Sequence, residues 1–227
     1  MKEQCIFAGF GGQGMLLIGK FLAEAGMETG KHVSWLPSYG PEMRGGTANC
    51  SVVVSDKPVA SPLIAMADTI LAMNKPSLLK FEGDVKPGGL LLINSSIIDI
   101  KTSRDDVDAV YVPCNEIAES VSNPKGANVV FLGAYVAKKP DVISEDAIIN
   151  AMRIELGEKK AKFLDGNIKA LQAGMAYVKE HCAEELALLK ADVPEIREIP
   201  TIRFHEAKQI MEEKYGHKSK NRYDLNP

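Results

Sequence analysis

A glycine-rich junction between an apolar run and a helical pattern constrains this chain more than any other stretch. The apolar run Cys5–Ala8 ends at the first of four glycines within six residues, and a helical pattern begins at Met15. Glycine lets the backbone turn sharply and approach a ligand, and the N–H groups that open a helix favour negative charge. The junction therefore predicts a site for a phosphate or a carboxylate. Gln13 is expected to offer a donor and an acceptor beside it.

The glycines at 9, 11 and 14 fit the G-x-G-x-x-G pattern of dinucleotide-binding folds, in the required place between a strand and a helix. Such folds also need an acidic residue about 20 positions further on, which holds the ribose hydroxyls. Here the second predicted strand, His32–Leu36, is followed by Pro37 and Ser38 without Asp or Glu. A nicotinamide cofactor held in the usual way is therefore disfavoured. An anion site and a purely structural tight turn both stay open.

The stretch 37–46 is predicted to be a rigid, polar loop that carries one arginine. It reads Pro37-Ser38-Tyr39-Gly40-Pro41-Glu42-Met43-Arg44-Gly45-Gly46. Arg44 is suited to clamp a phosphate or carboxylate with two parallel hydrogen bonds. The alternative is a surface pair between Arg44 and Glu42, which would contribute little. Together the two stretches give our candidate anion-binding residues: Gly9, Gly11, Gly12, Gln13, Gly14, Ser38, Tyr39, Arg44 and Gly45.

Strand and helix patterns alternate along the chain and predict its fold class. We expect strands at 4–9, 32–36, 48–55, 68–73, 90–94 and 107–112, and helices at 14–29, from 75, and at 114–121, 126–138, 144–155 and 160–182. This order is typical of a mostly parallel sheet covered on both faces, a three-layer α/β/α domain. The domain is expected to span 1–182. A charged linker and a helical tail of unknown role are expected over 183–227 as a C-terminal extension.

Composition and charge disfavour several functional classes. The 227 residues carry a formal net charge of −3 without a dense basic run, so we expect no nucleic acid partner. No apolar run reaches the roughly 18 residues that span a bilayer, and no signal peptide is recognised, so a cytoplasmic location is expected. The four cysteines, Cys5, Cys50, Cys114 and Cys182, lie far apart. We therefore expect no metal or iron–sulfur cluster held by this chain alone, and we predict no catalytic residue.

Three ordered motifs resemble the gamma subunit of 2-oxoacid:ferredoxin oxidoreductases. They are Gly9–Gly14, Ser38–Gly46 and Val54–Pro58, and the likeness covers roughly residues 3–180. It is strongest to the 2-oxoglutarate (KorC-like) and branched-chain types within the pyruvate:ferredoxin oxidoreductase gamma-domain family. The resemblance implies a complex that decarboxylates a 2-oxoacid oxidatively with coenzyme A. Its products would be acyl-coenzyme A, CO2 and reduced ferredoxin, with 2-oxoglutarate as the favoured substrate.

The same resemblance implies partners and cofactors. Alpha and beta subunits, and a delta subunit in some members, would assemble with this chain, which would be inactive alone. The alpha and beta subunits would bind thiamine diphosphate with Mg²⁺, and the beta or delta subunit would carry the [4Fe–4S] clusters. This chain would help to bind coenzyme A. A non-catalytic scaffold and a stand-alone nucleotide-binding module remain as alternatives, and self-association of the isolated chain stays open.

Overall fold

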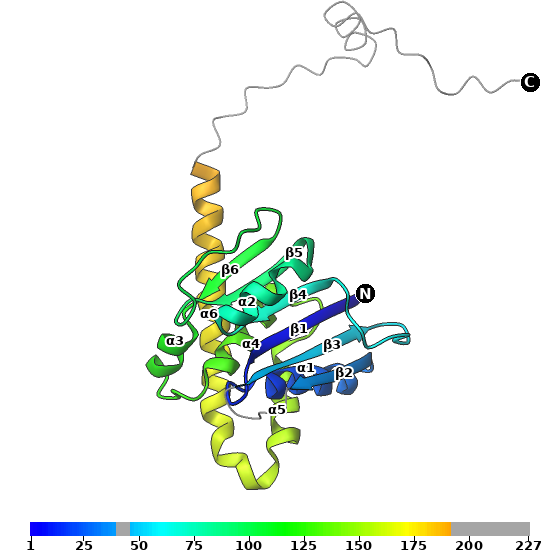
Figure 1. Cartoon of the computed structure of the whole chain (residues 1–227). Helices are drawn as coiled ribbons and strands as arrows, with labels where there is room; N and C mark the ends of the chain where they lie inside the picture. Colours follow the sequence, from blue (N-terminus) through cyan, green and yellow to red (C-terminus); the bar gives the residue numbers. More distant parts are fainter. Residues whose placement is uncertain (40–45, 192–227) are drawn as a thin grey trace, which may run out of the picture. The chain divides into compact units, whose positions relative to one another are not determined.

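The computed structural model describes residues 1–39 and 46–191 (Figure 1). Within them the strands form one mixed sheet in the order β2-β3-β1-β4-β5-β6. The parallel half contains β1, β4, β5 and β6, while β3 lies antiparallel between β2 and β1. The predicted α/β fold with a mostly parallel sheet is therefore confirmed. The strand bounds are β1 (Lys2–Phe10), β2 (His32–Tyr39), β3 (Thr47–Ser55), β4 (Ala67–Ala72), β5 (Val85–Asn94) and β6 (Asp108–Val112).

Helices cover the two faces of the sheet unequally. Of the described helices, α2 covers one face, packed on β1 and β4, and α1, α4, α5 and α6 lie on the other (Figure 1). The apolar core is larger on the second face, where Phe7, Phe21 and Phe131 are fully buried. The described helices are α1 (Met15–Glu28), α2 (Lys75–Phe81), α3 (Cys114–Ser120), α4 (Ala127–Lys138), α5 (Glu145–Lys160) and α6 (Leu164–Ala191), with short 3-10 turns η1 (Glu82–Asp84) and η2 (Ala161–Phe163).

Strand β2 is longer than the sequence predicted. It continues through Pro37 and Ser38 to Tyr39, which were expected in a loop. Proline is tolerated here because β2 is an edge strand, so a missing N–H need not interrupt the sheet. Ser38 is exposed and pairs with Asn49 of β3. The predicted loop is therefore shorter, and Arg44 and Gly45 lie outside the described residues.

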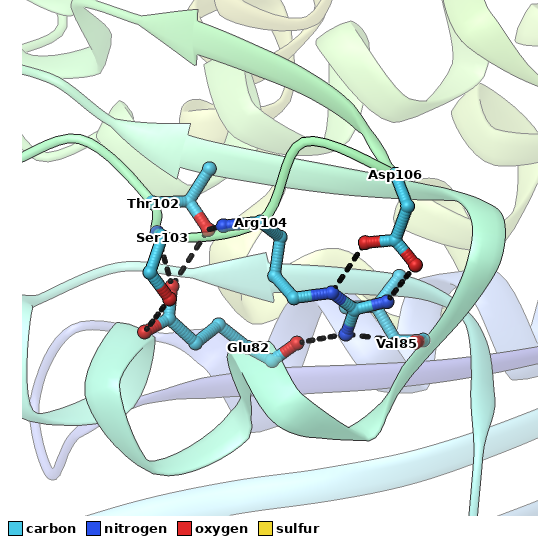
Figure 2. Close-up of polar contacts among 6 residues, drawn as sticks. All are labelled: Glu82, Val85, Thr102, Ser103, Arg104 and Asp106. Atoms are coloured by element: carbon cyan, nitrogen blue, oxygen red, sulfur yellow. Dashed lines mark hydrogen bonds and ion pairs between the residues drawn. The ribbon is translucent and has the colours of Figure 1, made fainter.

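The segment between β5 and β6 is fixed by one arginine (Figure 2). The Arg104 guanidinium forms two parallel hydrogen bonds with the Asp106 carboxylate, from Nε at 2.5 Å and from Nη2 at 2.7 Å. Its Nη1 donates to the carbonyls of Glu82 and Val85 at 2.9 and 3.1 Å. These hydrogen bonds raise the pKa of Arg104 and lower that of Asp106. All three guanidinium nitrogens of Arg104 therefore donate to groups of the protein itself.

The chain divides into two units, residues 1–184 and residues 185–227. The expected division into a domain at 1–182 and a tail at 183–227 stays a prediction, since most of the second unit lies outside the described residues. In the described part of the chain, no helix is long and apolar enough to cross a membrane.

Candidate functional site

The glycine junction lies where β1 ends and α1 begins, at the edge of the sheet formed by the carboxyl ends of the parallel strands. Open α/β sheets bind their ligands at this edge. Gly14, the residue before α1, has the left-handed dihedrals φ 73° and ψ 18°. No described side chain caps this helix end. The first N–H groups of α1 have no partner inside the helix, so this end of α1 is suited to an anion.

The glycines of the junction are required for different reasons. A Cβ at Gly9 would lie 2.8 Å from Met15 Cγ and 2.9 Å from Gln13 Oε1, so Gly9 allows close packing. A Cβ at Gly14 would lie 2.3 Å from Asn128 Nδ2. Gly12 differs, because its φ of +101° favours glycine while an added Cβ would meet no atom within 4 Å. Gly12 is exposed, and it is the glycine whose backbone a ligand can approach most freely.

The Gln13 side chain stabilises the junction through hydrogen bonds within the protein. Its Oε1 accepts hydrogen bonds from the Phe10 N–H at 2.7 Å and from Asn74 Nδ2 at 2.9 Å. Both lone pairs of this oxygen are therefore in use, and the acceptor that the sequence suggested for a ligand is already occupied. What Gln13 retains for a ligand is its side-chain amide donor.

One end of the stretch 37–46 contacts the glycine junction. The Gly11 N–H donates to the Gly46 carbonyl at 2.8 Å, so the residue that closes the arginine-containing stretch touches the junction. Register agrees with this contact, because Thr47 at the start of β3 pairs with Phe10 at the end of β1. Tyr39 pairs with Ala48 on the far side of β3. It is thus two strand spacings, about 10 Å, from the backbone of β1.

The candidate site residues predicted from the sequence did not include the buried asparagines at this edge. Asn74 follows β4 and caps α2: its Oδ1 accepts from the Ser77 N–H at 3.0 Å. Asn94, fully buried at the end of β5, accepts from the Cys114 N–H at 3.3 Å and was missed. Asn128 lies just after Gly126, the residue at the capping position of α4, and its Nδ2 donates to the Gly14 carbonyl at 3.2 Å. An asparagine at the end of a buried strand or within two residues of it was the available signal for Asn74 and Asn94.

The described cysteines do not suit a metal or a cluster. Cys5, Cys50 and Cys114 are free and buried. Burial raises the pKa of all three thiols, that of Cys50 to about 12. At neutral pH they are therefore protonated, whereas metals and clusters are bound by thiolates. In the described ranges, no group of three or more His, Cys, Asp or Glu residues could hold a metal ion.

We predict that these three thiols are unreactive in the folded chain. In a Cys182→Ser variant at pH 8, a thiol reagent should label them at least about a hundredfold more slowly than in guanidinium, because the reactive thiolate is both rare and shielded. Full labelling of three thiols per chain after unfolding is the internal control. Fast labelling of any one of them in the native variant would contradict the burial described above.

Several known proteins are similar to this chain in sequence and in fold. A family model for pyruvate ferredoxin/flavodoxin oxidoreductase matches residues 4–177. Ketoisovalerate oxidoreductase subunit VorA of Methanothermobacter marburgensis is 39% identical over 178 residues, 78% of this chain. That alignment covers only 37% of VorA, so this chain corresponds to about a third of that relative's length. The 2-oxoglutarate synthase subunit KorC of Methanocaldococcus jannaschii is 32% identical, over 67% of this chain and 82% of KorC.

Two solved structures extend the comparison. The keto/oxoacid ferredoxin oxidoreductase gamma subunit of Geobacter sulfurreducens PCA superposes with a TM-score of 0.67 and 32% identity, covering 78% of this chain and 99% of that one. The 2-oxoglutarate:ferredoxin oxidoreductase of Magnetococcus marinus, solved with 2-oxoglutarate, coenzyme A and succinyl-CoA bound, has a TM-score of 0.71 and 24% identity. It is matched over 79% of this chain and 31% of its own, and at this identity it supports the fold alone.

Proposed function

Since the chain belongs to the pyruvate ferredoxin/flavodoxin oxidoreductase family, as its motifs indicated, we propose that it works as the gamma subunit of a 2-oxoacid:ferredoxin oxidoreductase complex. The complex would decarboxylate a 2-oxoacid oxidatively in the cytoplasm, with coenzyme A and ferredoxin as co-substrates. We favour 2-oxoglutarate as the substrate, in line with the KorC relatives. Ketoisovalerate is the second candidate, because VorA is named for it.

We assign the redox and decarboxylation chemistry to partner subunits. Thiamine diphosphate with Mg²⁺ would supply the decarboxylation, and [4Fe–4S] clusters would carry electrons to ferredoxin. Alpha and beta subunits, with a delta subunit in some complexes, would hold these groups. The buried, protonated cysteines of this chain support the assignment, since they do not fit a cluster.

The role of this chain would be to receive the phosphate groups of coenzyme A at the glycine junction. The observation that carries this proposal is the Gly11–Gly46 hydrogen bond, which places the end of the arginine stretch beside the uncapped start of α1. A diphosphate oxygen could then accept from the Gly12 backbone and the first N–H groups of α1. Ser38, Tyr39, Arg44 and Gly45 complete the proposed site, with Arg44 as its cation.

An Arg44→Ala substitution in the assembled complex tests this role. Loss of a charge-assisted hydrogen bond to phosphate should raise the apparent KM for coenzyme A about tenfold or more. The KM for the 2-oxoacid and kcat at saturating coenzyme A should stay within about twofold. Lys57→Ala is the matched control, because it removes an exposed positive charge next to Ser55, at the opposite end of β3 from Gly46. If Arg44→Ala behaves like the control, or changes only stability or assembly, the proposal is wrong.

A scaffold role is the second candidate function. Gly9, Gln13 and Gly14 each have a packing or hydrogen-bonding reason inside the protein, which favours a structural junction. In that case the Arg44→Ala complex would keep its full affinity for coenzyme A. The stand-alone nucleotide-binding module has no such support, because β2 carries no acidic residue from His32 to Tyr39.

A further inference from the structure

We propose that Asn128 of α4 is a positioning residue that holds Gly14 in its left-handed conformation and thereby aims the first N–H groups of α1. The inference rests on the proposed coenzyme A site at the junction. Asn128 lies 114 residues from Gly14 in sequence and is only 7% exposed. It therefore acts from inside the protein and not as a ligand at the surface.

The contact between the two residues is both a hydrogen bond and a close packing contact. Asn128 Nδ2 donates to the Gly14 carbonyl at 3.2 Å, and the same carbonyl accepts the first helical hydrogen bond of α1, from the Ile18 N–H at 3.2 Å. The plane of the peptide that enters α1 is thus fixed from two sides. A Cβ at Gly14 would lie 2.3 Å from the same nitrogen, so the amide fits against glycine and no larger residue.

Asn128 is itself held in a fixed position. Every residue of α4 from Ala127 to Val136 is buried. At the start of this helix the Val129 and Val130 N–H groups both donate to the Gly126 carbonyl, at 2.8 and 2.9 Å. Near its end Lys139 Nζ lies 3.4 Å from the buried carboxylate of Glu3 on β1. The helix that carries Asn128 is therefore buried along most of its length and tied to β1 just after its last residue.

The hydrogen bond from Asn128 would favour anion binding because it orders Gly14 before a ligand arrives. An unrestrained glycine visits positive and negative φ almost equally, so a free Gly14 would have to be ordered each time a ligand binds. Asn74 Nδ2 donates to the side-chain Oε1 of Gln13, the residue before Gly14. Two neutral amides thus hold successive residues of the junction, and neither adds a negative charge that would oppose an anion.

Asn128→Ala and Asn128→Ser in the assembled complex test the inference with coenzyme A as the probe. Both variants remove the side-chain amide that reaches Gly14 and should raise the apparent KM for coenzyme A about fivefold, with kcat and the KM for the 2-oxoacid within about twofold of wild type. Amide hydrogen exchange across residues 10–18 should accelerate in both. Asn167→Ala is the matched control, because it removes an amide that pairs with Asn123 and does not touch the junction.

Outcomes separate this inference from the proposed function. If Arg44→Ala raises the KM for coenzyme A but both Asn128 variants do not, the junction binds coenzyme A and the positioning role is wrong. If hydrogen exchange across 10–18 is unchanged in the Asn128 variants, Gly14 is not held by Asn128 and the inference fails whatever the ligand. If exchange accelerates but neither the Arg44 nor the Asn128 substitutions change the apparent KM for coenzyme A, the proposed function and the inference built on it both fail. Should Asn128→Ala not assemble, Asn128→Ser decides.

Discussion

Alanine at Gly133 or at Gly174 is expected to prevent the chain from reaching its native core. Gly133 lies in α4 and Gly174 in α6, and each faces the backbone of the other helix. A Cβ at Gly133 would lie 2.0 Å from the Leu171 carbonyl oxygen, and a Cβ at Gly174 would lie 2.0 Å from the Val130 carbonyl oxygen. Helix backbones cannot swing aside as the end of a side chain can. The two helices would have to separate and lose their contacts along α4.

We expect each substitution to lower the free energy of unfolding by about 3 kcal/mol or more, a large share of the 5–15 kcal/mol typical of a domain. Urea titration followed by circular dichroism, or the soluble yield where no native chain forms, measures the effect. Gly83→Ala in η1 is the matched control, because nothing lies within 4 Å of its added Cβ, and it should cost less than about 1 kcal/mol. A Gly133→Ala chain within 1 kcal/mol of wild type would show that α4 and α6 do not pack this closely.

Most secondary structure was predictable because it depends on local periodicity. The apolar runs at β1 and β4 and the amphipathic pattern of α1 lie close to where they were expected, whereas β5 begins at Val85 and not at residue 90 as predicted. The predicted end of β2 was wrong because Pro37 is a turn signal in most contexts. Only the position of β2 at the sheet edge makes this proline compatible with a strand. In β3 buried Ala48 and Cys50 alternate with partly exposed Asn49 and Ser51, whereas residues 52–55 are all buried, so only the first half of the strand has one exposed face.

Only the part of the site that lies within one short stretch of sequence was predictable. The glycines and their place between strand and helix follow from a short stretch of sequence. The contacts that shape the junction come from Gly46, Asn74 and Asn128, and no local pattern specifies which strand ends and helices meet there. The decisive long-range feature is the antiparallel insertion of β3 between β2 and β1, since it brings Gly46 to Gly11.

Loss of Lys139 is expected to produce the second large effect, because it leaves a buried carboxylate without its cation. Glu3 on β1 is only 5% exposed, and its Oε1 accepts from Thr69 Oγ1 at 2.6 Å and lies 3.4 Å from Lys139 Nζ. Breaking a fully buried pair typically costs 3–5 kcal/mol. Here the Lys139 side chain is 27% exposed and water screens part of the attraction, so we expect Lys139→Met to cost about 2 kcal/mol.

A double-mutant cycle identifies the cause of that loss. Glu3→Gln retains an oxygen for the Thr69 hydroxyl and frees Lys139 to reach solvent, so it should cost less than Lys139→Met alone. The double variant should recover at least about half of the Lys139→Met loss, because the unpaired buried charge is then gone. Lys138→Met is the matched control: it breaks the pair with Asp108, whose side chain is 49% exposed, and should cost under about 1 kcal/mol. Additive effects of the two substitutions in the urea titrations would contradict the coupling, and Lys139 would then stabilise the chain through its aliphatic stem alone.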